Sequence, residues 1–123
     1  LSKSADKYPH LLEPYYEKLI LNMSHDTPVA VLRNSLRILQ DKQIEGELLG
    51  PLVNICFELL TSAEQPIAIK VFAMTVLFQA CKKEPDLANE LRPLIEEQMP
   101  YGSPGFKSRG KKILRQLDRL KQG

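Results

Sequence analysis

The chain has 123 residues, of which 43% are hydrophobic and 26% charged, and its formal net charge is +2. These values fit one compact soluble domain over residues 1–123, with no low-complexity segment. No run approaches the roughly 20 apolar residues of a membrane-spanning helix, and the polar residues from Leu1 to Lys7 are unlike a signal peptide. Because the first residue is not methionine, a removed leader or a longer parent protein stays open.

The first half of the chain predicts three helices. Apolar residues recur there every three or four positions, which is the spacing of one face of an α-helix. The first predicted helix covers residues 9–23, and the second covers 28–40 with apolar and polar residues on opposite sides. Gly46 breaks a polar link, after which a third helix is predicted over 47–61.

The fourth predicted helix, over residues 66–83, is apolar on nearly every side. Between Pro66 and Cys81, the polar residues after the proline are Lys70, Thr75 and Gln79. A helix with apolar residues all round is enclosed by neighbouring elements. We therefore expect this helix to be the centre of the fold.

The last two predicted helices cover residues 86–99 and 104–121, with a turn rich in proline and glycine between them. Pro93 is expected to kink the first of these helices or to lie near its early turns. The second has one apolar face and one heavily charged face. This pattern is typical of a helix that caps the end of a helical stack.

Two sets of residues recur at a fixed interval along the chain. Three basic residues that each follow a large apolar residue are 37 residues apart: Arg33, Lys70 and Lys107. The prolines that open the same segments are 38 residues apart: Pro28, Pro66 and Pro104. A period of this length indicates a stack of repeated helix pairs.

The helix pairs, the proline in the first helix of each pair and the apolar-basic dipeptide in the second resemble HEAT repeats, which are armadillo-type helical repeats. The resemblance covers essentially the whole chain and implies an all-α fold, an α-α superhelix that forms a right-handed solenoid of about three HEAT-like pairs. The implied repeats are residues 9–41, 46–83 and 85–121. A generic helical bundle or an armadillo-like variant remains the alternative.

One part of the HEAT pattern is incomplete in this sequence. The acidic residue that precedes the basic one is present as Asp26 and Glu64, but the third repeat has no acid there. The resemblance implies that this acid and the basic residue form hydrogen bonds between repeats. The third repeat is therefore expected to stack by apolar contacts alone.

The sequence contains no pattern that favours catalysis, a metal or a cofactor. His10 and His25 have no further ligands at metal-binding spacing. Ser24 and Ser103 lie among turn and capping residues, and the short match of residues 99–103 to the Met-Pro-Lys loop of the fumarase and adenylosuccinate lyase superfamily lacks the lysine and the preceding serines. We therefore expect a non-enzymatic protein without a cofactor.

The two cysteines, Cys56 and Cys81, lie in apolar helical stretches and are expected to be reduced core residues rather than a disulfide. Reduced thiols favour a cytoplasmic location.

The charge along the chain is uneven, because the part from Pro104 onward has seven basic residues and one acidic residue. This basic helix makes a nucleic-acid-binding module the main alternative to a protein-binding scaffold. Against that alternative, the chain has no tryptophan.

In HEAT-like stacks the second helices of the pairs line the concave face, which predicts a groove with an apolar floor and basic walls. Such a surface suits an acidic peptide or an amphipathic helix with an apolar anchor. The alternative is that neighbouring helices or a dimer mate cover the central helix. The predicted partner-binding residues are Arg33, Arg37, Ile67, Lys70, Met74, Phe78, Lys107, Lys111 and Arg115.

Overall fold

The computed structural model describes residues 13–122 and contains six α-helices and no strand within that range, which confirms the all-α prediction. Three short 3-10 helices precede or follow α-helices in the same range. The α-helices are α2 (Glu13–Leu21), α3 (Val29–Leu39), α4 (Leu49–Thr61), α5 (Ile67–Lys83), α6 (Ala88–Gln98) and α7 (Pro104–Gln122). The 3-10 helices are η2 (Gly46–Leu48), η3 (Pro85–Leu87) and η4 (Met99–Tyr101).

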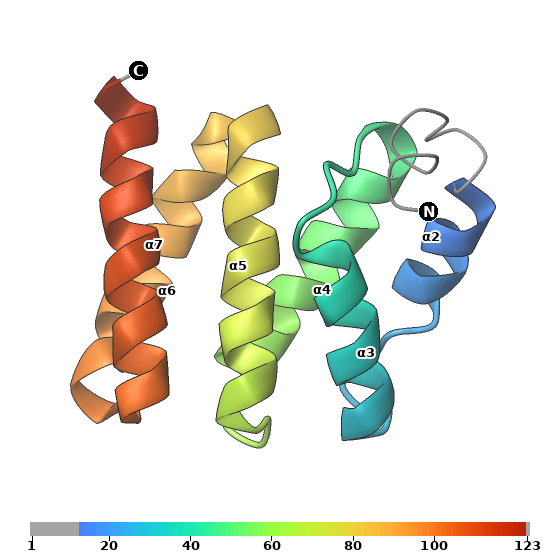
Figure 1. Ribbon diagram of the computed structural model, residues 1–123, viewed down its shortest axis with the longest axis horizontal. Helices are drawn as coiled ribbons and strands as arrows, with labels where there is room; N and C mark the ends of the chain where they lie inside the picture. The colour runs from blue at the N-terminus through green and yellow to red at the C-terminus, as the bar shows by residue number, and fades with distance from the viewer. Residues whose placement is uncertain (1–12, 123) are drawn as a thin grey trace.

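The helices form two layers. In Figure 1, α3, α5 and α7 lie side by side at the front, and α4 and α6 lie behind them. Helix α5 contacts α3 on one side, α7 on the other, and both α4 and α6 in the second layer. This arrangement of stacked helix pairs confirms the predicted solenoid, with α5 at its centre.

The helix boundaries differ from the prediction mainly where prolines and glycine interrupt the regular helix. The helix predicted over 86–99 is shorter, because 3-10 turns that contain Pro85 and Pro100 form its two ends. Gly46 has a φ of +68°, a left-handed conformation that glycine adopts without steric cost, and it starts η2 before α4 begins. Residues 9–12 of the first predicted helix lie outside the described part of the chain.

Helix α5 contributes more buried residues to the core than any other helix that the structure describes. Its side chains of Ile69, Ala73, Met74 and Leu77 are completely buried, and Phe78 is 6% exposed. Full burial of one large aliphatic side chain stabilises the fold by about 1.5–3 kcal/mol. The burial of residues on several sides of α5 explains why its sequence has no clear polar face.

Helix α7 packs against α5, α6 and η4 through one apolar side. Phe106, Ile113 and Leu117 are buried there. A Cβ atom at Gly110 would lie 2.6 Å from the Sδ of Met99, so a larger residue there would require the Met99 side chain to move. On the other side of the contact, Arg92 of α6 forms an ion pair with Asp118 and donates to the carbonyl oxygen of Leu114 at 3.3 Å.

Candidate functional site

The front layer of the fold presents an open face made by α3, α5 and α7. On α3 the side chains of Arg33 and Arg37 are exposed, and Arg37 donates a 2.9 Å hydrogen bond to the Oδ1 of Asn34. On α7 the predicted residues Lys107, Lys111 and Arg115 are exposed. The structure thus leaves all five of these basic side chains accessible to a partner.

The apolar floor is where the sequence-based prediction is wrong. Met74 is completely buried and Phe78 is 6% exposed, so neither lines an open groove. The repeat equivalents of Met74 and Phe78 are both exposed: Arg37 lies on α3, and Asp41 lies in the turn after it. Helix α5 differs from α3 because it has neighbours on both sides as well as behind it, and these cover the positions that α3 leaves open.

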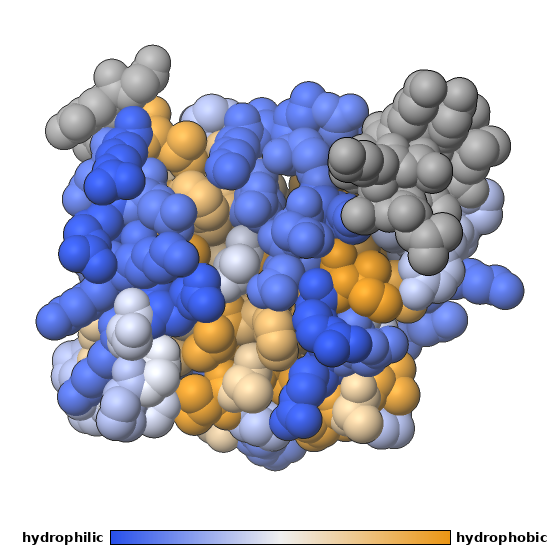
Figure 2. Space-filling view, viewed as in Figure 1, coloured by the Kyte–Doolittle hydropathy of each residue, from blue (hydrophilic) through white to orange (hydrophobic). Residues whose placement is uncertain are grey.

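A different set of α5 side chains remains partly accessible. Ala68 is exposed, and Val71, Phe72 and Thr75 are half-buried, at positions that share one side of the helix. We call these four residues the α5 strip. Figure 2 shows an apolar area over the lower half of α5, with hydrophilic surface over α7 on one side and along α3 on the other. The open face therefore combines an apolar centre with charged borders.

Ile67 and Lys70 belong to a separate cleft at the N-terminal end of α5. This cleft has a volume of about 330 Å³ and lies between α5, the end of α4, and the connection from α6 to α7. Its lining also includes Tyr101, which is 90% exposed, and Glu97. Ile67 is 39% exposed and Lys70 is half-buried.

The polar groups of this cleft form a chain of hydrogen bonds. The Nζ of Lys70 donates to the Oε1 of Gln98 at 3.2 Å, and the Nε2 of Gln98 donates to the carbonyl oxygen of Leu60 at 2.9 Å. Sequence reasoning missed Gln98 and Tyr101. The one signal for Tyr101 was an aromatic residue in a turn rich in proline and glycine.

Contacts between repeats differ from those that the HEAT resemblance implied. Asp26 lies 3.4 Å from the Nε2 of its neighbour His25, and within the described part neither Asp26 nor Glu64 pairs with a basic residue of another repeat. Glutamine side chains make such contacts instead, since Gln65 donates to the carbonyl oxygen of His25 at 3.2 Å. The expectation that the third repeat stacks by apolar contacts alone is also wrong, because Gln98 joins it to the second.

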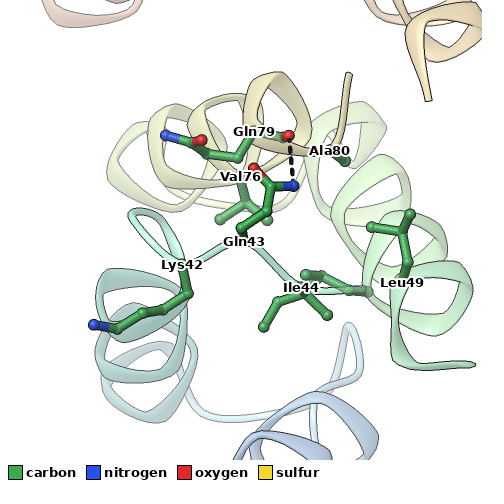
Figure 3. Close-up of a pocket in the computed structure, with 8 residues that line it drawn as sticks. Lys42, Gln43, Ile44, Leu49, Val76, Gln79 and Ala80 are labelled. Carbon is green, nitrogen blue, oxygen red and sulfur yellow. Dashed lines mark hydrogen bonds between the residues drawn. The ribbon is translucent and has the colours of Figure 1, made fainter. Parts of the chain in front are cut away.

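Figure 3 shows another of these contacts, where the Nε2 of Gln43 donates to the carbonyl oxygen of Gln79 at 3.3 Å. The space beside it has a volume of about 10 Å³. That volume holds about one water molecule. This site is therefore a packing contact between α5 and the loop before η2 rather than a ligand pocket.

A larger cleft of about 590 Å³ lies between the end of α5, η3, α6 and the C-terminal half of α7. Its charged lining residues are Lys82, Asp86 and Arg92. Arg92 already contacts Asp118 and Glu96. Lys82 lies 5.3 Å from the ring centre of Phe78, a cation-π contact.

Both cysteines are free thiols in the core, as predicted. Burial raises the pKa of Cys81 to about 11 and raises the pKa of Cys56 still further. Of the two histidines, His25 is exposed and His10 lies outside the described residues. Within residues 13–122 no three His, Cys, Asp or Glu side chains are grouped as metal ligands would be.

Comparison with protein families identifies the kind of repeat in this chain. A family model described as a HEAT repeat domain matches residues 1–117. A search of curated proteins and a search of solved structures found no match. Repeats of this kind are generally non-catalytic and typically mediate interactions between proteins. Among the helices that the structure describes, none has the length and apolar character needed to cross a membrane.

Proposed function

The chain belongs to the HEAT repeat family, and from this membership we propose that it is a non-catalytic scaffold that binds a partner protein through the open face of α3, α5 and α7. The observation that carries the proposal is the composition of this face. The α5 strip supplies an apolar centre, and exposed basic side chains border it on α3 and α7.

The partner that fits this face is an acidic peptide or an amphipathic helix. An apolar anchor of the partner loses contact with water against the α5 strip, and this burial supplies affinity. Acidic residues beside the anchor meet Arg33 and Arg37 on α3, which favours encounter and orientation. A cytoplasmic location is part of the proposal and is supported by the two reduced cysteines.

The test is capture of partners from the source cell by the immobilised chain, with charge reversals on the face. We expect Arg33→Glu and Arg37→Glu to remove the captured protein, because both side chains are exposed and their loss leaves the core intact. Lys18→Glu is the matched control, since Lys18 is an exposed cation on α2, outside the face. A partner that is retained by both reversed variants would contradict the proposal.

Nucleic acid is the second candidate partner, and one observation favours it. Helix α7 carries exposed Lys107, Lys111, Lys112, Arg115 and Arg119, and in the described part of the chain none of them forms a salt bridge. Such a surface can neutralise phosphates. Against it, no aromatic side chain is exposed on this helix for stacking with bases.

Binding of duplex and single-stranded nucleic acid at several salt concentrations separates the two candidates. We expect weak binding that the combined change of Lys111, Lys112 and Arg115 to Glu abolishes. A sub-micromolar affinity of the unmodified chain that falls steeply with salt would favour the nucleic-acid function over the protein scaffold.

A further inference from the structure

The cleft at the N-terminal end of α5 has apolar side chains at its mouth. Tyr101 is 90% exposed and Ile67 is 39% exposed, although both are large apolar or aromatic residues. Leu94 and Phe106 line the same cleft. Exposed apolar side chains that converge on one hollow are typical of binding sites, because a ligand there removes their surface from water.

The positive charge of Lys70 in this cleft has no negatively charged partner within the described residues. Lys70 is half-buried, and its ammonium contacts the neutral amide oxygen of Gln98. Within residues 14–120 no carboxylate lies within 4.0 Å of Lys70. The hydrogen bond from Lys70 to Gln98 already has an ionised donor, but a carboxylate acceptor would add an attraction between opposite charges that the neutral amide of Gln98 does not supply. A carboxylate that entered the cleft would therefore be a better partner for Lys70 than Gln98 is.

Glu97 is the other charged residue in the cleft and acts against an incoming anion. Its side chain is exposed and forms no salt bridge among the described residues. Water screens an exposed carboxylate more strongly than it screens a half-buried ammonium. Lys70 therefore dominates the inner part of the cleft, and Glu97 weakens the attraction at the edge.

We propose that this cleft binds a segment of a partner protein in which an aromatic or long aliphatic side chain stands beside a carboxylate. The apolar side chain packs against Tyr101 and Ile67, and the carboxylate accepts a hydrogen bond from Lys70. The volume of about 330 Å³ is at the lower end of the range for ligand sites, which suits one large side chain and its neighbour. This inference rests on the proposed protein-binding function and names the chemistry of the partner at Ile67 and Lys70.

The test compares two peptides that differ only in charge, acetyl-Asp-Phe-Asp-amide and acetyl-Asn-Phe-Asn-amide. Each is added to the isotope-labelled 123-residue chain while the backbone amide resonances are followed by NMR. We expect the acidic peptide to shift the resonances of residues around Tyr101 and Gln98, and the neutral peptide to bind at least about fivefold more weakly. Equal affinities, or shifts confined to another part of the chain, would overturn the inference.

Substitutions in the cleft give effects of opposite sign. Lys70→Gln should weaken binding of the acidic peptide, whereas Glu97→Gln should strengthen it, and Tyr101→Ala should weaken binding of both peptides. Tyr15→Ala is the matched control, because Tyr15 is an exposed tyrosine on α2 and should change neither affinity. If Lys70→Gln disturbs the fold, the Glu97 variant and the peptide pair still decide the outcome.

Other occupants of the cleft would give distinct results. Resonances of the cleft that shift with protein concentration in the absence of peptide would show that a second copy of the chain fills it, and would overturn the inference. If neither peptide binds while Arg33→Glu and Arg37→Glu still remove a captured partner, the cleft inference fails and the proposed function stands.

Discussion

Lys70 of α5 and Gln98 of α6 are joined by a 3.2 Å hydrogen bond that connects the second helix pair to the third. Gln98 uses its other amide atom to donate to the carbonyl oxygen of Leu60 at the end of α4. One side chain of α6 thus contacts two other helices, α5 and α4. In the repeat pattern, Lys70 is the basic residue that was expected to pair with an acid, and here a glutamine takes that place.

Replacing Gln98 should weaken the contact between these repeats. Gln98→Ala removes an acceptor for Lys70 and a donor for Leu60, and we expect the free energy of unfolding to fall by about 1–3 kcal/mol. Urea unfolding followed by circular dichroism measures this change. Gln116→Ala is the control, since Gln116 is also half-buried but forms no hydrogen bond through its side chain within the described residues. Equal effects of the two changes would show that the bonds of Gln98 contribute nothing.

The central position of α5 should make its core side chains more important than those of the outer helices. Leu77 is completely buried, and we expect Leu77→Ala to lower the free energy of unfolding by about 2–5 kcal/mol. Leu117→Ala on α7 should cost less, because α7 contacts fewer helices. A neutral Leu77→Ala would contradict the stacked arrangement.

Met74 and Ala68 lie on the same helix but differ completely in exposure. Met74→Asp places a charge in the core and should destabilise the fold by more than about 3 kcal/mol or prevent folding. Ala68→Asp, on the α5 strip, should change the free energy of unfolding by less than about 0.5 kcal/mol. Melting temperatures of the two variants measure this difference. A stable Met74→Asp protein would show that Met74 lies on the open face and not in the core.

The two thiols should be unreactive while the chain is folded. The thiolate is the reactive form, and burial raises the pKa of Cys81 from 9.0 to about 11. At pH 8 a thiol reagent such as DTNB should therefore label neither Cys56 nor Cys81 until urea is added. The thiol of Cys81 loses its proton at a lower pH in the unfolded chain than in the folded chain. The free energy of unfolding should therefore fall as pH rises from 9.0 towards 11. Rapid labelling of the native chain at pH 8 would contradict this placement of the cysteines.

The fold was largely predictable because it depends on patterns that are local in sequence. The apolar spacing marked each helix, and the lack of a polar face on residues 66–83 correctly placed that helix at the centre. The ends of helices were less predictable where a proline allows either an α-helical or a 3-10 turn, as at Pro85 and Pro100.

The candidate site was less predictable because exposure depends on neighbours that are distant in sequence. Arg37 and Met74 hold equivalent positions in consecutive repeats, yet the first is exposed and the second completely buried. On a helix that is apolar on nearly every side, the sequence does not distinguish the side that neighbours cover from the side they leave open. The partners of Lys70 and the exposure of Tyr101 likewise depend on the path of the chain between α6 and α7.

Site-specific photo-crosslinking tests the protein-binding role of the open face most directly. A benzoylphenylalanine is introduced at Ala68 on the α5 strip and, as the control, at Glu58, an exposed residue of α4 in the opposite layer. Irradiation in the source cell, followed by mass spectrometry, identifies what each position contacts. We expect a defined protein partner to crosslink at Ala68 and not at Glu58, and Arg33→Glu to reduce that crosslink. Crosslinking at Glu58 alone, or of nucleic acid at Ala68 without any protein, would contradict the account.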